Sequence, residues 1–103
     1  MIARLWRGLA APATADAYED HFTRHVAPAL AALAGHRGAW LLRRDAGGQV
    51  EFLAVTLWES RDSIRAFAGD DIEAAVVEPE ARAVLAAFEE VARHFEVVSR
   101  TGT

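Results

Sequence analysis

A pair of adjacent glycines divides the middle of the chain into two strand-like runs and constrains the fold more than any other feature. Residues 38–44 and 49–58 are rich in Trp, Leu, Val and Phe, and Asp45-Ala46-Gly47-Gly48 lies between them. Two glycines between apolar runs are typical of a tight β-hairpin turn. From residue 52 the second run is almost continuously apolar, which predicts a strand covered on both faces. The fold must therefore contain a sheet built around this hairpin.

The segment before the hairpin has the period of a helix. Apolar residues recur at spacings of four and three along residues 14–34, which places them on one helix face. Thr14 is the expected N-cap and Gly35 the expected stop. Pro28 lies inside the pattern and predicts a kink or a split near residues 24–25. The inward face consists of Tyr18, Phe22, Val26, Leu30 and Leu33.

Two shorter helices are expected after the hairpin. Ser60 is placed to cap a helix that Gly69 ends. Pro79 suits the first turn of another helix, whose apolar face continues to Val91. Residues 72–77, between these helices, fit either a loose turn or a short helical piece.

Both ends of the chain are predicted to be strands, at residues 2–9 and 94–98. The order strand, helix, strand, strand, helix, strand matches the ferredoxin-like motif, an α+β fold whose antiparallel sheet carries helices on one face. We expect residues 1–103 to form one such domain. Because the hairpin strand is apolar on both faces, the open face of the sheet predicts a second copy packed against it. The expected assembly is a homodimer, a dimeric α/β barrel.

The missing residue types exclude several chemistries. The 103 residues include no cysteine, no lysine and no asparagine, which excludes a thiolate nucleophile, a cysteine–zinc site and a lysine-bound pyridoxal phosphate. The formal net charge of −4 argues against a nucleic-acid partner. No apolar stretch reaches the roughly 18 residues that a membrane span needs. We therefore expect a cytoplasmic protein with no membrane or nucleic-acid partner.

Residues 56–60, Thr-Leu-Trp-Glu-Ser, are followed by Ile64, Phe67 and Gly69. This stretch resembles the Trp-Glu-Ser segment of the antibiotic biosynthesis monooxygenase family. The first helix and the closing strand also look like those of its small members, so the resemblance covers nearly the whole chain. It implies the dimeric α/β barrel, with a pocket between sheet and helices.

Neither of the family's two reaction types transfers residue by residue. The cofactor-free enzymes that oxidise phenolic polyketides use an asparagine, a tyrosine and an arginine at positions that hold Ala54, Ile64 and Glu78 here. The haem-degrading branch uses a tryptophan and a haem-ligating histidine where this chain has Phe67 and Val77. The resemblance therefore implies the fold, the dimer and the pocket, and we expect no cofactor.

His25 is the first candidate for catalysis, as a proton acceptor, because histidine titrates near neutral pH. The motif tryptophan Trp58 is the second, as part of the pocket wall. Residues expected to contact a flat aromatic ligand are Trp6, Tyr18, Phe22, Trp40, Phe67 and His94. The tryptophans suit core or dimer-interface positions equally well. His21 and His25 have the spacing of two metal ligands on a helix, but no carboxylate completes a known motif, so we expect no metal.

Three functions are compatible with these residues. The first is cofactor-independent oxygenation of an aromatic or quinone-like compound, in which the protein removes a proton and the electron-rich substrate itself reduces dioxygen. The second is a non-catalytic, ligand-binding or stress-related dimeric module. The third is an isomerase, cyclase or decarboxylase, which needs only one acid–base residue. Dependence on oxygen separates the first from the third.

Overall fold

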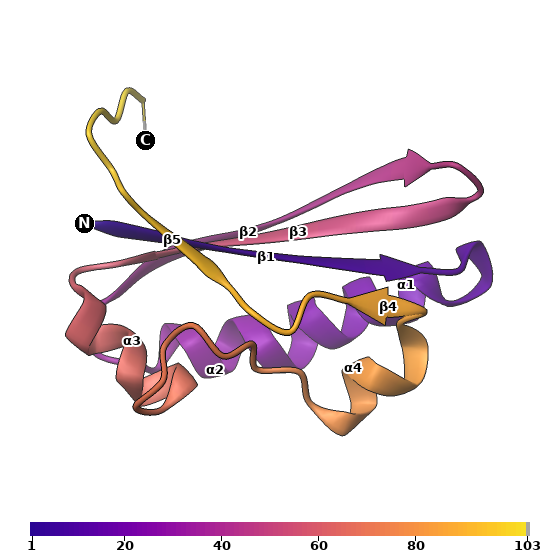
Figure 1. Cartoon of the computed structure of the whole chain (residues 1–103), viewed down its shortest axis with the longest axis horizontal. Coiled ribbons are helices and arrows are strands. Elements are labelled where there is room, and N and C mark those ends of the chain that lie inside the picture. The colour runs from indigo at the N-terminus through magenta and orange to yellow at the C-terminus, as the bar shows by residue number, and fades with distance from the viewer. Residues whose placement is uncertain (103) are drawn as a thin grey trace.

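The computed structural model describes residues 1–102 and shows an antiparallel sheet with helices on one face (Figure 1). The strands run in the order β2-β3-β1, and β4 and β5 both pair with the free edge of β1. This is the predicted ferredoxin-like α+β fold. The strands are β1 (Ile2–Ala10), β2 (His36–Ala46), β3 (Gln49–Trp58), β4 (Ala87–Phe88) and β5 (Arg93–Glu96).

The predicted hairpin is formed by β2 and β3. Ala46 pairs with Gln49, so Gly47 and Gly48 alone make the turn. Their φ angles are +60° and +84°, values that glycine adopts without steric cost and that two-residue hairpin turns require. Because the turn has only two residues, strand pairing continues up to Ala46 and Gln49. Strand β2 is therefore longer than the predicted strand at residues 38–44.

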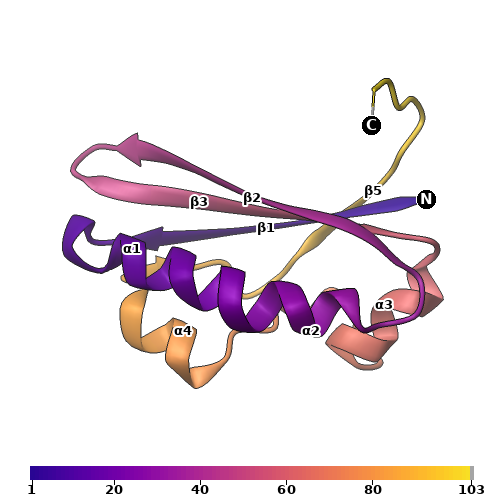
Figure 2. The same cartoon turned by 180° about the vertical axis from the view of Figure 1, so that it is seen from behind.

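The long first helix has three parts that follow one line beneath the sheet (Figure 2). They are α1 (Pro12–His21), a π-helical turn η1 (Phe22–Val26) and α2 (Ala27–Ala31). The split predicted from Pro28 appears as the π turn. Pro28 has no N–H group, so it cannot donate the α-helical hydrogen bond to the carbonyl four residues before it. Thr14 is not the N-cap: Ala11 holds that position and Pro12 starts the helix. Thr14 Oγ1 instead donates to the Val84 carbonyl at 2.9 Å.

The second half of the chain differs from the prediction after Pro79. As expected, α3 (Arg61–Ala68) begins with Ser60, whose side chain accepts from the Ser63 N–H. The helix α4 (Pro79–Val84) is short, however, and its predicted continuation to Val91 is wrong. The free edge of β1 takes the following residues: the N–H groups of residues 86 and 89 donate to carbonyls of β1 at 2.8 and 2.9 Å. Unpaired strand groups thus override the helical period.

Two groups of buried side chains lie between the sheet and the helices. One consists of Ala10, Ala15, Tyr18, Val50, Phe52 and Ala81, and the other of Ile2, Leu30, Trp58 and Ile64. Gly35 joins α2 to the sheet beside the second group. It has a φ of +85°, and a Cβ there would stand 2.4 Å from that of Ser63. Only glycine allows the end of the first helix to come so close to α3.

The face of the sheet away from the helices is apolar and uncovered in the single chain. Directly paired residues share a face, and two such rows are Trp40–Val55–Leu5 and Leu42–Leu53. Trp40 and Leu42 are 46% and 48% exposed. No helix among residues 1–102 has the length and hydropathy to span a membrane.

Candidate functional site

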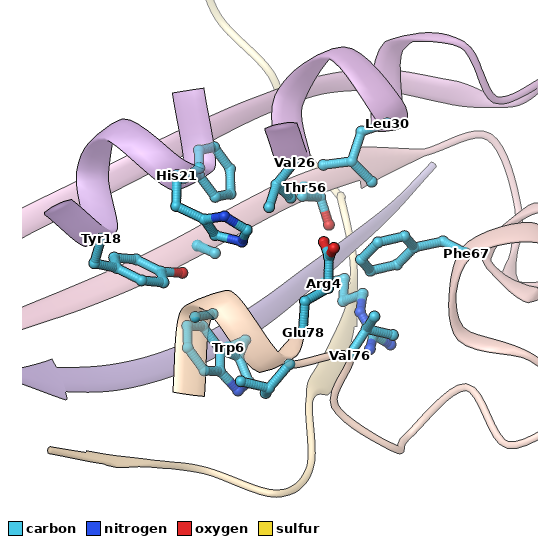
Figure 3. Close-up of a pocket in the computed structure, with 14 residues that line it drawn as sticks. Arg4, Trp6, Tyr18, His21, Val26, Leu30, Thr56, Phe67, Val76 and Glu78 are labelled. Carbon is cyan, nitrogen blue, oxygen red and sulfur yellow. The ribbon is translucent and has the colours of Figure 1, made fainter. Parts of the chain in front are cut away.

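A hollow between the helices and the sheet is the candidate site (Figure 3). The centre of a water-sized sphere can occupy about 50 Å³ of it, and the empty space around that volume, including the part open to solvent, is about 600 Å³. The strands β1 and β3 form its floor, α1 to α2 one side, and residues 76–81 the other. Its lining is mostly apolar, with polar groups from Arg4, Tyr18, His21, Thr56 and Glu78. Such a concave, largely apolar space with a few polar groups is typical of a small-molecule site.

Four of the predicted ligand contacts line this hollow: Trp6, Tyr18, Phe22 and Phe67. The rings of Trp6 and Tyr18 have centroids 6.1 Å apart. Trp6 is fixed because its Nε1–H donates to the Glu89 carbonyl at 2.8 Å. The aromatic side chains come from β1, α1, η1 and α3, so a flat ligand would meet rings on several sides.

His21 places an imidazole nitrogen in the hollow. The residue is only 8% exposed, and its Nε2 is buried without a hydrogen-bond partner among residues 1–102. Unpartnered buried polar atoms are uncommon and call for a partner such as a water, an ion or a ligand. Nε2 of His36 is the other such atom in the described part of the chain, but His36 does not line the hollow. In the tautomer that carries its proton on Nδ1, His21 presents an Nε2 lone pair to whatever enters. It is therefore placed to accept a proton.

Tyr18 lies beside His21, with ring centroids 6.5 Å apart. Figure 3 shows the Tyr18 hydroxyl and the His21 imidazole on the same side of the hollow. Burial raises the pKa of Tyr18 well above its ordinary value, because a phenolate would be poorly solvated there. The hydroxyl therefore stays protonated and can donate a hydrogen bond to a ligand oxygen.

Arg4 contributes a guanidinium to the floor although the residue is only 4% exposed. It donates to the carbonyls of Ile72 and Ala74, and its Nη1 lies 3.0 Å from Nε2 of His94. Burial lowers its pKa. These hydrogen bonds connect residues 72–74, before α4, to strand β1. The Arg4 side chain therefore helps to position one side of the hollow and also places a positive charge beside it.

Glu78 and Thr56 complete the polar lining. Glu78 precedes α4, and its carboxylate points toward the middle of the hollow in Figure 3, although the residue as a whole is exposed. The Thr56 hydroxyl accepts a hydrogen bond from Trp58 Nε1 at 2.9 Å. Thr56 therefore links the lining to the residue behind it.

The structure differs from the sequence analysis for both catalytic candidates. His25 is exposed and does not line the hollow. In the π turn hydrogen bonds close over five residues instead of four, so Val26 takes the inward place one turn after His21. Trp58 is fully buried, not part of the wall. Its ring packs behind that of Phe67, with the two ring centroids 6.1 Å apart, and makes a T-shaped contact with the His36 ring.

Two predicted ligand contacts also lie elsewhere. Trp40 is on the opposite face of the sheet, because Arg43 on the same strand reaches over the Phe52 ring on the helix side and the two residues differ in parity. His94 touches Arg4 but does not line the hollow. Its pKa is lowered, first by burial and then by the Arg4 charge.

The sequence pattern did not single out Arg4, and it favoured His25, whereas the histidine that lines the hollow is His21. A signal for Arg4 was present, since it shares the strand parity of Trp6. No signal separated His21 from His25, because the π turn that divides them depends on packing. Among residues 1–102 no three His, Asp or Glu side chains gather as a metal site.

A family model described as antibiotic biosynthesis monooxygenase matches residues 1–79. No curated protein matches the chain. The chain is similar to a heme-degrader from Mycobacterium tuberculosis, solved with two hemes bound in its active site, at 26% identity and a TM-score of 0.65. That similarity covers 99% of this chain and 100% of the other.

Two further solved structures share the fold. A putative antibiotic biosynthesis monooxygenase from Bacillus cereus is 14% identical, with a TM-score of 0.69 over 100% of this chain and 96% of the other. A cofactor-independent oxygenase from Streptomyces nogalater is 19% identical, with a TM-score of 0.62 over 96% and 95%.

Proposed function

Because the chain belongs to the antibiotic biosynthesis monooxygenase family, we propose that its pocket binds a flat, electron-rich aromatic compound and oxidises it with dioxygen, without a bound cofactor. The observation that carries this proposal is the buried, unpartnered Nε2 of His21 in an aromatic hollow. A base in this position suits a substrate with an acidic C–H beside aromatic rings.

The proposed reaction converts a methylene group to a carbonyl. His21 Nε2 accepts a proton from the methylene carbon, and the Tyr18 hydroxyl donates to the substrate oxygen on which negative charge collects. The carbanion gives one electron to dioxygen, and the two radicals combine as a peroxide. The peroxide loses water as His21 returns its proton and a second C–H proton leaves. One oxygen atom stays in the product and the other leaves as water (CH₂ + O₂ → C=O + H₂O).

Oxygen uptake with anthrone tests the proposal, since anthrone is a flat tricycle with one acidic methylene. We expect the protein to accelerate uptake above the uncatalysed rate. His21→Gln should lower that acceleration by about 100-fold or more, the usual contribution of a general base. The matched control is His25→Gln, four residues along the same helix but exposed, which should keep the full rate. Equal rates for both variants and the wild type would remove His21 from the mechanism.

The alternative functions give different outcomes. An isomerase, cyclase or decarboxylase would turn its substrate over equally well without oxygen. A binding module would return its ligand chemically unchanged after aerobic incubation. The present proposal requires that one molecule of carbonyl product forms for each molecule of oxygen consumed.

Haem is a second candidate ligand, as a substrate. The heme-degrader from Mycobacterium tuberculosis is 26% identical over nearly the whole chain, and His21 Nε2 is a free imidazole nitrogen within the pocket. An imidazole of this kind suits iron ligation. Titration with haemin should then shift the Soret band in the wild type but not in His21→Gln. Identical spectra for both proteins would exclude this ligation.

We also propose that the protein is a homodimer whose sheets pack face to face. The rows of apolar side chains on the open face support this assembly. An ion-paired group, Glu51 with Arg7 and Arg44, lies at the turn end of the same face and gives it a polar border. Sedimentation equilibrium at micromolar concentration tests the dimer, and a monomer at all concentrations would disprove it.

A further inference from the structure

Arg4 is a buried cation that forms no ion pair within the part of the chain that the structure describes. It is 4% exposed, and among residues 1–102 no ion pair includes it. The other arginines that pair with acids do so at or near the surface. A buried charge normally has a counter-charge, because desolvation without one costs several kcal/mol per ion. The missing partner of Arg4 therefore requires an explanation.

The existing contacts of Arg4 leave part of its hydrogen-bonding capacity unused. Two carbonyls and the His94 ring accept from its Nη atoms, while its Nε–H has no partner among the described residues. A guanidinium has five N–H groups, and neutral carbonyls do not cancel a full positive charge. Arg4 lines the hollow, and its guanidinium carbon lies over the ring of Phe67, another lining residue, 5.7 Å from the ring centroid.

The other ionisable groups at the hollow do not supply the counter-charge. Glu78 also lines the hollow, but its carboxylate makes no ion pair with Arg4. The other nearby groups, the Tyr18 hydroxyl and the imidazoles of His21 and His94, bring no negative charge at neutral pH. Arg4 therefore places an unpaired positive charge beside apolar walls, where an anion in contact with it gains more than it would in water.

We propose that the ligand of this pocket is an aromatic carboxylate, with its carboxylate on Arg4 and its ring system among Trp6, Tyr18 and Phe67. The inference names the substrate class for the proposed function and rests on it in one respect only, that a flat aromatic compound occupies this pocket. A planar guanidinium suits a carboxylate because the two pair through parallel hydrogen bonds.

Calorimetric titration with two matched probes tests the inference. The probes are 2-naphthoate and 2-naphthamide, which share one ring system and differ in charge. Both are titrated into the full-length protein without oxygen, so that turnover plays no part. The wild type should bind the carboxylate about tenfold or more tightly than the amide, as expected for a charge-assisted contact. Equal affinities, a preference for the amide, or no binding of either probe would overturn the inference.

Two variants locate the charge effect. Arg4→Gln should weaken naphthoate binding about tenfold or more and change naphthamide binding by less than about twofold. Comparing two ligands on one variant cancels any general loss of pocket structure. Glu78→Gln should strengthen naphthoate binding severalfold, because it removes a like charge from the lining of the hollow. Equal losses for both probes in Arg4→Gln would mean that Arg4 only shapes the fold.

The result is separable from the oxygenase proposal. A carboxylate preference that depends on Arg4 stands even if no oxygen is consumed. Conversely, oxygen uptake with neutral substrates and no carboxylate preference would refute this inference alone. Haemin also carries carboxylates, so it is titrated in parallel. If Arg4→Gln weakens haemin binding, the inference is supported and the aromatic carboxylate is identified as a porphyrin.

Discussion

Replacing the motif tryptophan, Trp58→Phe, should destabilise the protein without impairing its pocket. Trp58 is fully buried, and its indole N–H donates to Thr56 Oγ1 at 2.9 Å. The smaller ring loses apolar burial and leaves a cavity, together about 1–2 kcal/mol. The lost hydrogen bond adds about 1 kcal/mol. The total, about 2–3 kcal/mol, corresponds to a melting temperature lower by about 10 °C or more for a domain of this size.

The assay pairs thermal unfolding, at one fixed protein concentration, with naphthoate calorimetry. For Trp58→Phe we expect the large fall in melting temperature and an affinity within about twofold of the wild type below the transition. The matched variant is Phe67→Leu, which changes the ring that Trp58 packs behind and that lines the hollow. It should show the reverse: a smaller loss of stability and binding that is severalfold weaker.

The reasoning would be refuted by the opposite result for Trp58→Phe. If affinity fell more than tenfold while the melting temperature changed by less than about 3 °C, Trp58 would contact the ligand. The motif tryptophan would then have the role of a pocket wall that the sequence analysis assigned to it.

Three further predictions concern the open sheet face, a histidine and a glycine. Leu42→Glu should give monomers by sedimentation, because it places a charge in the proposed interface, while Ala29→Glu on the outer helix surface should not. The free energy of unfolding should fall as pH drops from about 7.5 to 5. The pKa of His94 is lower in the folded than in the unfolded protein, so the unfolded chain takes up the proton first. His94→Gln should make the free energy of unfolding, measured with urea, depend less on pH. Gly35→Ala should cost about 2–3 kcal/mol by urea unfolding, because its φ is +85° and its Cβ would collide with α3; Gly47→Ala, with open space around it, should cost about 1–2 kcal/mol.

Each of these has a contrary outcome. A dimer in Leu42→Glu would place the interface elsewhere. An unchanged pH slope in His94→Gln would assign the slope to other groups, among them His36, whose pKa burial also lowers. Equal costs at both glycines would show that the close approach to α3 carries no penalty beyond the backbone angle.

The sequence by itself determined the local structure of this protein. The glycine pair required a hairpin, and an apolar strand on each side of it required a sheet. The spacing from Tyr18 to Leu30 fixed which helix face turns inward, and these signals were enough for the order of elements up to α4 and for the fold class. They also placed Trp6, Tyr18, Phe22 and Phe67 among the pocket residues, because periods of two and 3.6 residues decide which side chains share a face.

The tertiary structure decided what depends on contacts between distant residues. The edge of β1 converted a predicted helix into β4, since unpaired strand groups form hydrogen bonds more favourably than a helix end exposed to water. The π turn brought His21 rather than His25 to the pocket. Burial behind Phe67 made Trp58 a core residue, and the fold bonded Arg4 to two backbone carbonyls while giving it no ion pair among residues 1–102. Local sequence carries the period of an element, but burial and charge balance arise only when the elements pack together.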